Sequence, residues 1–423
     1  MYPSLKDVRG RPRSAATHPW WRPAVPGNVV YLGVTSMFTD VSSEMVNSVI
    51  PLFLTIQLGF SRFQLGLFNG AFQGIAAFTA LGGAALADRR GRYKEVAGAG
   101  YAVSAGTRIG LSAARHAWAP ATGLLYADRA AKGLRTAPRD ALISLSALPG
   151  RLGEAFGVHR ALDTAGGLAG PLVAFALLSA VPGSYGTIFT ASFWIALVGV
   201  AILVLFVHNQ AGAAARPARR VSLRTGFGLL RIPAFRRLVI AGAALSAVTI
   251  GDALVYLTFQ QRSSMTTRFF PLLYVGTAVG YVILAIPLGR LADRIGPARV
   301  FLAGQLLLIA VDLVLLRQDP GPLALVVMLG ALGIYYAATD GVLAAVASNV
   351  LPAETRASGL ALLGAVMALV AFGASTAFGA LWGWNGPGEA VEVFLAGLVV
   401  AVVLSAVALR PLLVERAGPG AAR

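Results

Sequence analysis

Stretches of about twenty mostly apolar residues follow one another along almost the whole chain, separated by short polar breaks. About 20 such residues carry an α-helix across the hydrocarbon core of a bilayer, so this pattern is typical of a protein that crosses a membrane many times. Of 423 residues, 57% are hydrophobic and 13% are charged, whereas soluble domains have about 45–50% and about 25%. No segment is long and polar enough to fold alone in water. The sequence therefore predicts an all-α integral membrane protein and excludes a soluble enzyme.

Twelve membrane-spanning helices are predicted, and a basic break near the middle divides them into two sets of six. The segment 209–237 contains seven arginines and almost no apolar run, so we expect a cytoplasmic linker between an N-terminal bundle, 29–208, and a C-terminal bundle, 238–412. Residues 1–28 and 413–423 are then cytoplasmic tails. The predicted spans are 29–58, 63–87, 95–114, 119–145, 155–180, 185–208, 238–260, 270–291, 298–316, 321–348, 356–383 and 388–412.

The distribution of basic residues predicts the orientation of the chain. The tail before the first span has five basic residues and the loop after the second span has four, whereas the loops after the fifth and eleventh spans have none. Since basic loops stay on the cytoplasmic side, we expect both termini in the cytoplasm and the protein in the cytoplasmic (inner) membrane of a bacterium. The net charge of +17 is accounted for by these helix ends, so no nucleic-acid partner is expected.

A short motif occurs twice, after the second helix of each half. The first copy reads Leu-Ala-Asp-Arg-Arg-Gly-Arg over 86–92, and the second reads Gly-Arg-Leu-Ala-Asp-Arg-Ile-Gly over 289–296. The repeat resembles the loop motif of the major facilitator superfamily, whose two six-helix halves are related by a pseudo-two-fold axis. The first copy departs from that pattern, because Ala84 stands where a glycine is expected.

An acid at a helix end, beside a glycine turn and several bases, can lock two helices together on one face of the membrane. We therefore expect Asp88 and Asp293 to lie on the same face. The residues expected to form these conformational locks are Asp88, Arg89, Gly91, Arg92, Gly289, Asp293, Arg294 and Gly296.

Four bases of the fourth span lie three or four residues apart, which places them in one stripe of an α-helix. Each would cost about 2.5–3.5 kcal/mol if it faced lipid at mid-membrane, so the stripe should line a watery cavity or pair with acids. Acids stand in the same span and in the first and fifth spans. We predict one interior network that contains Arg129, Lys132, Arg135, Arg139, Asp140 and Arg160, with Asp40, Glu44, Asp128 and Asp163 as the remaining acids.

Three carboxylates are candidates to carry a coupling proton: Asp40, Glu44 and Asp163. Acids inside a membrane span are natural proton carriers, and Asp40 and Glu44 lie one helical turn apart, where Ser36 and Asn47 extend the same face. The alternative is that these charges form only a structural network that holds the helices together.

A glycine pattern in the fifth span bears on the kind of transport. Gly157, Gly166, Gly170 and Pro171 resemble the antiporter motif of drug/proton exchangers, although the next glycine of that motif is replaced by Ala174. Small residues let helices approach closely, and Gly-Pro weakens a helix that must bend. A plain packing interface is the alternative interpretation.

The second half is poorer in charge and is expected to contribute more of the substrate wall, through Asp252, Tyr335, Tyr336 and Asp340. Tyrosine rings can stack on an aromatic or cationic substrate, although tyrosines packed between helices are the simpler interpretation. No phosphate-binding G-x4-G-K-[ST] loop is present, the four histidines are scattered and cysteine is absent. Neither a metal nor another cofactor is therefore expected.

The resemblance implies a proton-coupled secondary transporter that works as a monomer by alternating access, with a small molecule and protons as its partners in the lipid bilayer. The glycine pattern of the fifth span favours an efflux antiporter for a small organic compound. One alternative is a proton symporter that imports an organic anion, for which the bases of the fourth span would be the binding groups. A remoter alternative is a membrane-embedded enzyme or a lipid scramblase.

Overall fold

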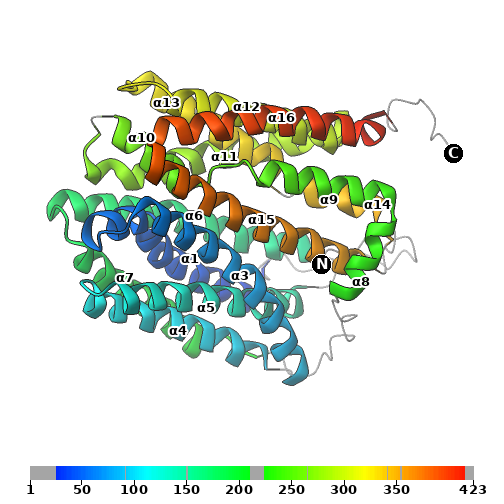
Figure 1. Cartoon of the computed structure of the whole chain (residues 1–423). Coiled ribbons are helices and arrows are strands. Elements are labelled where there is room, and N and C mark those ends of the chain that lie inside the picture. The colour runs from blue at the N-terminus through cyan, green and yellow to red at the C-terminus, as the bar shows by residue number, and fades with distance from the viewer. Residues whose placement is uncertain are drawn as a thin grey trace, which may run out of the picture.

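The computed structural model describes residues 25–90, 92–148, 151–209, 223–263, 265–340, 342–352 and 355–414. Every regular element within these ranges is a helix. Helices α1 to α7 pack together, helices α9 to α16 pack together, and α15 lies against α3 where the two groups meet (Figure 1).

The helices of the first group begin and end close to the predicted spans. They are α1 Gly27–Asn47, α2 Ile50–Leu52, the π-helical turn η2 Phe53–Gln57, α3 Arg62–Arg90, α4 Tyr93–Ala114, α5 Trp118–Ser146, α6 Leu152–Ala180 and α7 Tyr185–Phe206.

The second group contains more breaks. Its helices are α8 Leu223–Gly228, η3 Leu229–Arg231, α9 Pro233–Ser246, α10 Asp252–Arg262, η4 Thr267–Phe269, α11 Phe270–Ile295, α12 Pro297–Leu315, α13 Pro322–Thr339, α14 Val342–Val350, α15 Arg356–Asn385 and α16 Pro387–Val414.

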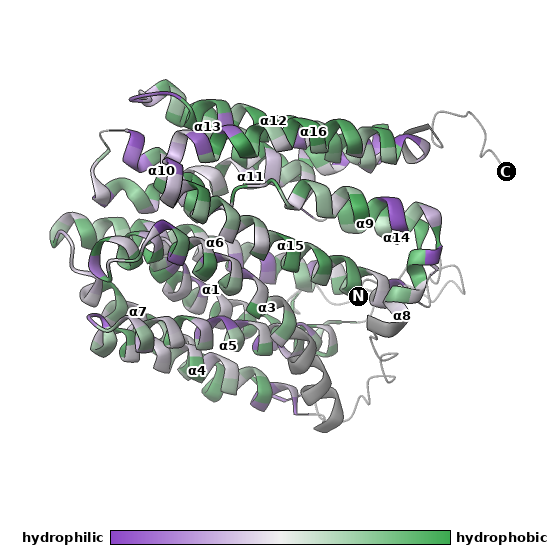
Figure 2. Ribbon diagram, in the orientation of Figure 1, coloured by the Kyte–Doolittle hydropathy of each residue, from purple (hydrophilic) through white to green (hydrophobic). Residues whose placement is uncertain are grey.

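The outside of the bundle is apolar, as it is in a protein embedded in lipid. Seven segments of the described chain are long and apolar enough to cross a membrane. Large apolar side chains such as Trp194, Leu323 and Val407 are exposed by 60%, 77% and 67%, and hydrophilic residues stand out at the turns between helices (Figure 2). The predicted all-α membrane fold is confirmed, whereas the count of twelve spans stays a prediction that fits this fold.

Two predicted spans of the second half are interrupted in the structure. The span 238–260 is split because α9 ends at Ser246 and α10 begins only at Asp252, after Gly251 with an extended backbone. The run Val248-Thr249-Ile250-Gly251 combines β-branched residues with glycine, all of them weak helix formers. The span 321–348 is split at Asp340, which is also extended. Hydropathy alone does not detect the first break, because Ala247, Val248 and Ile250 are apolar.

The predicted linker is shorter than expected. Helix α8 and the turn η3 both lie inside 209–237, and α9 begins at Pro233, five residues before the predicted span. Proline is favoured at the first position of a helix, where its missing N–H is not needed. Residues 210–222 of the linker lie outside the described part of the chain.

The turns between helices gather at two opposite ends of the bundle. The "hairpin face" carries the turns at 58–61, 115–117, 181–184, 263–266, 316–321 and 386. The "tail face" carries the turns at 295–297 and 351–355, the short helix α8, and the ends of α3, α5 and α11 (Figure 1). Because α3 and α11 both end at the tail face, Asp88 and Asp293 belong to the same face, as predicted.

At the hairpin face the two groups of helices meet along three glycines, Gly66, Gly70 and Gly379, which we call the glycine seam. A Cβ atom on Gly66 would strike the carbonyl oxygen of Ser375, and one on Gly70 would come within 2.8 Å of the Phe372 carbonyl oxygen. Asn69 Nδ2 donates a hydrogen bond of 3.1 Å to Ser375 Oγ across the same contact. Backbone therefore touches backbone here, which only small residues allow.

The glycine seam leads to a first prediction. Gly66→Ala and Gly379→Ala should each lower the midpoint of thermal unfolding in detergent, because overpacking costs about 1–3 kcal/mol when backbone atoms must move apart. Gly74→Ala on the same helix is the matched control, since its Cβ would meet nothing within 4 Å. Equal midpoints for all three variants would show that the seam is not tightly packed.

The predicted orientation can be tested because the chain has no cysteine of its own. A single cysteine at Gln318, on the hairpin face, should react with a membrane-impermeant maleimide in intact spheroplasts. One at Ile295, on the tail face, should react only after the membrane is permeabilised, because the base-rich side of a membrane protein is cytoplasmic. The reverse labelling pattern would invert the assigned topology.

Candidate functional site

A cavity of about 420 Å³ lies between the two groups of helices. Its volume is within the range of about 300–1,000 Å³ that is usual for small-molecule sites. Helices α1, α5 and α6 form one wall, and α10, α11 and α13 form the other. The charged and aromatic residues that line it are Asp40, Glu44, Lys132, Asp163, Asp252, Tyr256, Tyr274, Tyr281, Tyr336 and Asp340.

The central cavity continues toward the tail face. A second cavity of about 480 Å³ shares Tyr281 and Asp340 with it and reaches Asp293 and Pro297 near the end of α11. At the opposite end, the rings of Phe175 on α6 and Phe269 on η4 stack with centroids 5.6 Å apart. The structure is therefore closed at the hairpin face and open toward the tail face.

Three bases of α5 each reach a carboxylate of the first wall. Lys132 Nζ lies 3.3 Å from Glu44 Oε1, and Arg135 Nη2 lies 3.7 Å from Asp40 Oδ1. Arg139 Nη1 lies 3.6 Å from Asp163 Oδ1. The stripe of bases inferred from helical spacing therefore faces α1 and α6, and the charges compensate one another away from lipid.

Ser36 lies at the centre of a small hydrogen-bond cluster behind these pairs. Arg139 Nη1 donates to Ser36 Oγ at 3.2 Å, while Tyr101 Oη and His159 Nε2 lie 3.1 Å and 3.4 Å from the same oxygen. The Arg135 guanidinium lies over the Tyr101 ring, 4.4 Å from its centroid. These contacts connect α1, α4, α5 and α6 and hold the bases of α5 in fixed positions.

The most buried ion pair was missed by sequence reasoning. Arg108 Nη2 of α4 lies 2.9 Å from Asp128 Oδ1 of α5, and the two side chains are only 1% and 4% exposed. Arg108 also donates to Ser43 Oγ on α1. A lone arginine within an apolar span is itself a signal, because it requires a partner inside the protein. The sequence could not show which of several acids that partner is.

Arg129 behaves differently from the other bases of the stripe. It forms no ion pair within 4 Å among the described residues, and its guanidinium lies over the Phe72 ring at 4.0 Å. It lines a smaller cavity of about 200 Å³, together with Glu44 and Asp252. Asn47 lines the same cavity and donates a hydrogen bond to Glu44.

Two further charges of the predicted network lie at its edge. Asp140 accepts a hydrogen bond of 3.0 Å from Arg139, its neighbour in the chain. Arg160 is 69% exposed and lies 3.8 Å from Asp163. Both are partly solvated, so they contribute less than the buried pairs.

The second wall combines carboxylates with tyrosine hydroxyls. Tyr336 Oη donates a short hydrogen bond to Asp252 Oδ1, and Tyr281 Oη donates one of 3.3 Å to Asp340 Oδ2. The helix breaks at 247–251 and at 340 bring both aspartates to the cavity. Among the described residues no base lies within 4 Å of either carboxylate.

Some expected wall residues do not line the central cavity. Ser36 is buried in the cluster described above, and Tyr335 packs against the apolar core beside the ring of Tyr336. The helical spacing placed them on the right helices, but small rotations of α1 and α13 decide which side chains reach the cavity.

The glycines of the fifth predicted span, which lie on α6, are only partly packed. Gly170 approaches α1 so closely that a Cβ atom would lie 2.6 Å from the Val41 carbonyl oxygen, and Gly166 similarly faces the Met37 carbonyl. Gly157 has nothing within 4 Å, so it makes no such contact. Pro171 lines the central cavity.

The repeated loops are described for the second copy and partly for the first. Gly289, Asp293 and Arg294 lie in the last turns of α11, and Gly296 ends the helix with φ of 99°, a conformation that favours glycine. Arg92 precedes α4, and Asp88 and Arg89 stand at the end of α3. The side chains of Asp88 and Arg89, and Gly91 altogether, lie outside the described residues.

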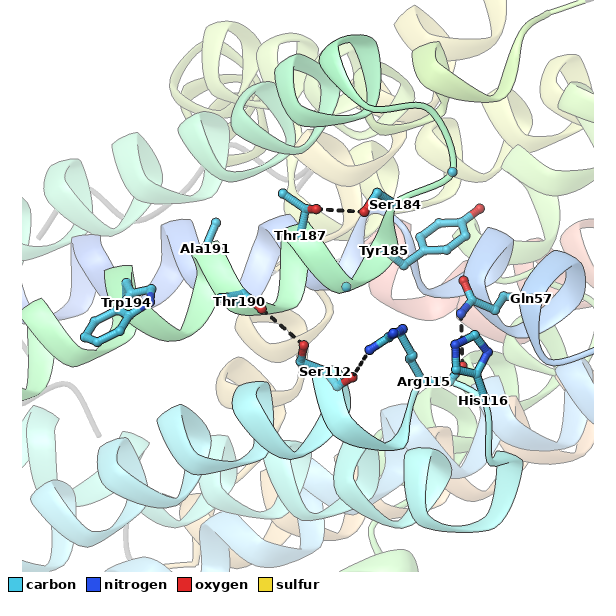
Figure 3. Close-up of a pocket in the computed structure, with 12 residues that line it drawn as sticks. Gln57, Ser112, Arg115, His116, Ser184, Tyr185, Thr187, Thr190, Ala191 and Trp194 are labelled. Atoms are coloured by element: carbon cyan, nitrogen blue, oxygen red, sulfur yellow. Dashed lines mark hydrogen bonds between the residues drawn. The ribbon is translucent and has the colours of Figure 1, made fainter.

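A larger hollow of about 780 Å³ lies at the hairpin face between α4 and α7 (Figure 3). Arg115 and His116 are its titratable bases, and Ser112 contacts Thr190 there at 3.1 Å. It contains no acid and lies on the outside of the bundle. The central cavity, which lies between the two groups of helices, is therefore the candidate functional site. No three His, Asp or Glu side chains in the described ranges converge to hold a metal ion.

An all-helical membrane bundle with a charged cavity between two groups of helices is typical of secondary transporters. The sequence model of the Major Facilitator Superfamily matches residues 32–278 and 264–422. The chain belongs to that superfamily.

Relatives and solved structures agree with this assignment. The chain is 28% identical over 387 residues to an uncharacterised MFS-type transporter of Methanocaldococcus jannaschii, which covers 89% of this chain and 92% of the relative. It is similar in fold to a POT family transporter in complex with 5-aminolevulinic acid, with a TM-score of 0.75 and 14% identity over 92% of this chain and 97% of that one. A nucleoside transporter has a TM-score of 0.74 and 15% identity over 91% and 99%.

A third solved structure is similar in fold. An inward-facing bacterial homologue of the human lysosomal transporter Spinster has a TM-score of 0.69 and 15% identity, over 93% of this chain and 98% of that one. At such identity the likeness concerns the fold alone.

The buried pair Arg108–Asp128 generates a third prediction. Asp128→Asn should lower the stability of the protein by about 3–5 kcal/mol, because it leaves a buried guanidinium without its charged partner. Thermal unfolding in detergent measures this. Glu154→Gln is the control, since Glu154 forms a solvent-exposed pair with Arg151 that should contribute less than about 1 kcal/mol. If Asp128→Asn unfolded at the wild-type temperature, the pair would not stabilise the bundle.

Proposed function

We propose that this protein is a proton-coupled secondary transporter that exports a small organic compound by antiport. The observation that carries the proposal is the row of three ion pairs, Lys132–Glu44, Arg135–Asp40 and Arg139–Asp163. Each places a carboxylate of the central cavity against a base of α5. The proposed setting is the bacterial inner membrane, with both termini in the cytoplasm and one chain as the working unit.

An ion pair of this kind couples protonation to conformation. A proton on Glu44 removes the negative charge that holds the Lys132 ammonium, so the lysine must find another partner or water. Because unpaired charge is costly inside the protein, the arrangement of α1 relative to α5 depends on whether the carboxylate is protonated. Asp40 and Asp163 offer the same coupling with Arg135 and Arg139.

The closed hairpin face and the open tail face correspond to one end of an alternating-access cycle. The close approach of Gly170 and Gly166 to α1 joins two of the helices that carry the proposed proton carriers. Movement of α6 would therefore carry Asp163 together with α1. This coupled movement of α6 and α1 supports the antiport role that the glycine pattern of the fifth predicted span implies.

A proton symporter for an organic anion is supported less well by the cavity. That function would use the bases of α5 as binding groups, yet of these only Lys132 lines the central cavity, against five carboxylates. The Arg135 side chain is 2% exposed and forms an ion pair with Asp40. An anion entering the cavity would meet a predominantly acidic lining.

The proton-carrier role predicts a separation of two activities. In proteoliposomes with an internal pH-sensitive dye, a panel of organic compounds of both charges identifies those whose transport dissipates an imposed pH gradient. The three neutral variants are Asp40→Asn, Glu44→Gln and Asp163→Asn. The variant at the residue that carries the proton should lose gradient-driven transport, because a neutral amide cannot take up the proton. Exchange of labelled compound across the membrane without a gradient should continue.

The matched control is Glu154→Gln, which removes an acid outside the cavity and should leave both activities unchanged. If all three cavity variants drove transport at the wild-type rate, these acids would be structural and the proton-carrier role would be wrong.

A further inference from the structure

The two walls of the central cavity compensate their carboxylates in different ways. On the first wall, Asp40, Glu44 and Asp163 each have a base of α5 within 4 Å. On the second wall, Asp252 and Asp340 have tyrosine hydroxyls as partners, and no base within 4 Å among the described residues. The second wall therefore presents two carboxylates that no base of the described residues pairs within 4 Å.

Aromatic rings surround these two carboxylates. Tyr256, Tyr274, Tyr281 and Tyr336 all line the central cavity, and the rings of Tyr256 and Tyr274 pack edge to face with centroids 4.6 Å apart. Tyrosine faces attract cations when water is excluded. The rings are an observation separate from the charges, and both favour the same ligand chemistry.

Three tyrosine hydroxyls of this wall donate hydrogen bonds within the protein. Tyr256 Oη donates to Thr277 Oγ1 at 2.7 Å, and Tyr336 and Tyr281 donate to the two aspartates. These bonds fix the orientation of the carboxylates, so the remaining acceptor positions and the ring faces are what a ligand meets. A rigid arrangement of this kind lowers the entropy lost on binding.

Arg129 is a base that lies in the same small cavity as Asp252, where it would compensate that carboxylate if the two formed an ion pair. It shares the smaller adjoining cavity with Asp252 and Glu44, but its guanidinium lies against the Phe72 ring and forms no ion pair within 4 Å. Lys132, the one base lining the central cavity, is paired with Glu44. Among the described residues, neither base forms an ion pair within 4 Å with a carboxylate of the second wall.

We infer that the substrate is an organic cation, an ammonium or similar group attached to an aromatic or apolar body, whose positive charge lies between Asp252 and Asp340 among the tyrosines. A cation there supplies the charge that the protein leaves unpaired, which a neutral or anionic compound cannot do. The inference rests on the proposed transport role of the central cavity but not on proton coupling.

Equilibrium binding without any gradient tests the inference. Purified protein in a neutral detergent is titrated by calorimetry with phenyltrimethylammonium, benzamide and benzenesulfonate, which share a phenyl ring and differ in charge. The cation should bind at least about tenfold more tightly than the neutral compound, and the anion should not bind. Asp252→Asn and Asp340→Asn should each weaken cation binding by about ten- to a hundredfold, because each removes a charged partner of the ligand.

Asp319→Asn is the matched control, since Asp319 lies in an exposed turn of the hairpin face and should leave binding unchanged. If an asparagine variant does not fold, Tyr336→Phe and Tyr281→Phe replace it. Each keeps the ring and the carboxylate, so the preference for the cation should persist with affinity lowered a few-fold.

The inference is overturned if benzenesulfonate binds as tightly as phenyltrimethylammonium, if no cation of a panel extended to benzylamine and tetraethylammonium binds, or if both asparagine variants bind the cation like wild type. Proton coupling fails separately, through unchanged gradient-driven transport in the Asp40, Glu44 and Asp163 variants. A protein that binds cations without using protons would keep this inference and lose the proposed antiport.

Discussion

The compensation of charge inside an apolar bundle is the constraint on which the arrangement of this protein depends. Helix α5 carries a row of bases that cannot face lipid, and each buried base must find an acid, a hydroxyl or a ring. Arg108, Arg135 and Arg139 connect α4 and α5 to α1 and α6 through such contacts. The rotation of these helices about their axes follows from the need to bring the partners together. The cavity exists because the compensated charges occupy one side of each helix.

The class of fold could be predicted from the sequence because lipid imposes simple rules. Length and hydropathy locate the helices, and the repeated Leu-Ala-Asp-Arg loops indicate the duplication. The pairing of the α5 bases with acids of α1 and α6 also followed from helical spacing and the cost of unpaired charge. These inferences depend on properties of single helices, or on the free-energy cost of unpaired charge in a membrane, which is so large that few arrangements of the helices satisfy it.

The remaining details depend on tertiary packing, which periodicity does not contain. The partner of Arg108 could not be chosen, because several acids lie at similar depth in the membrane. Arg129 was expected in the ion-pair network, yet it lies against Phe72, since a ring can replace a carboxylate as its neighbour. The break before Asp252 arises where mostly apolar but weakly helix-forming residues meet a polar cavity, and hydropathy does not distinguish such residues from the rest of a span.

The glycine seam has a consequence for how the hairpin face can open. Backbone atoms of α3 and α15 touch directly, with one side-chain hydrogen bond, Asn69 to Ser375, across the contact. Dispersion attraction between such atoms falls sharply within the first ångström of separation, and the Arg62 guanidinium of α3, which lies 5.0 Å from the centroid of the Trp382 ring of α15, is a long side chain that crosses the same contact. A partly opened seam thus loses most of its attraction without admitting enough water to solvate the backbone. Closure at this face should behave as a switch with two positions, and a leak of ions through a half-open state is disfavoured by the same contact that seals it.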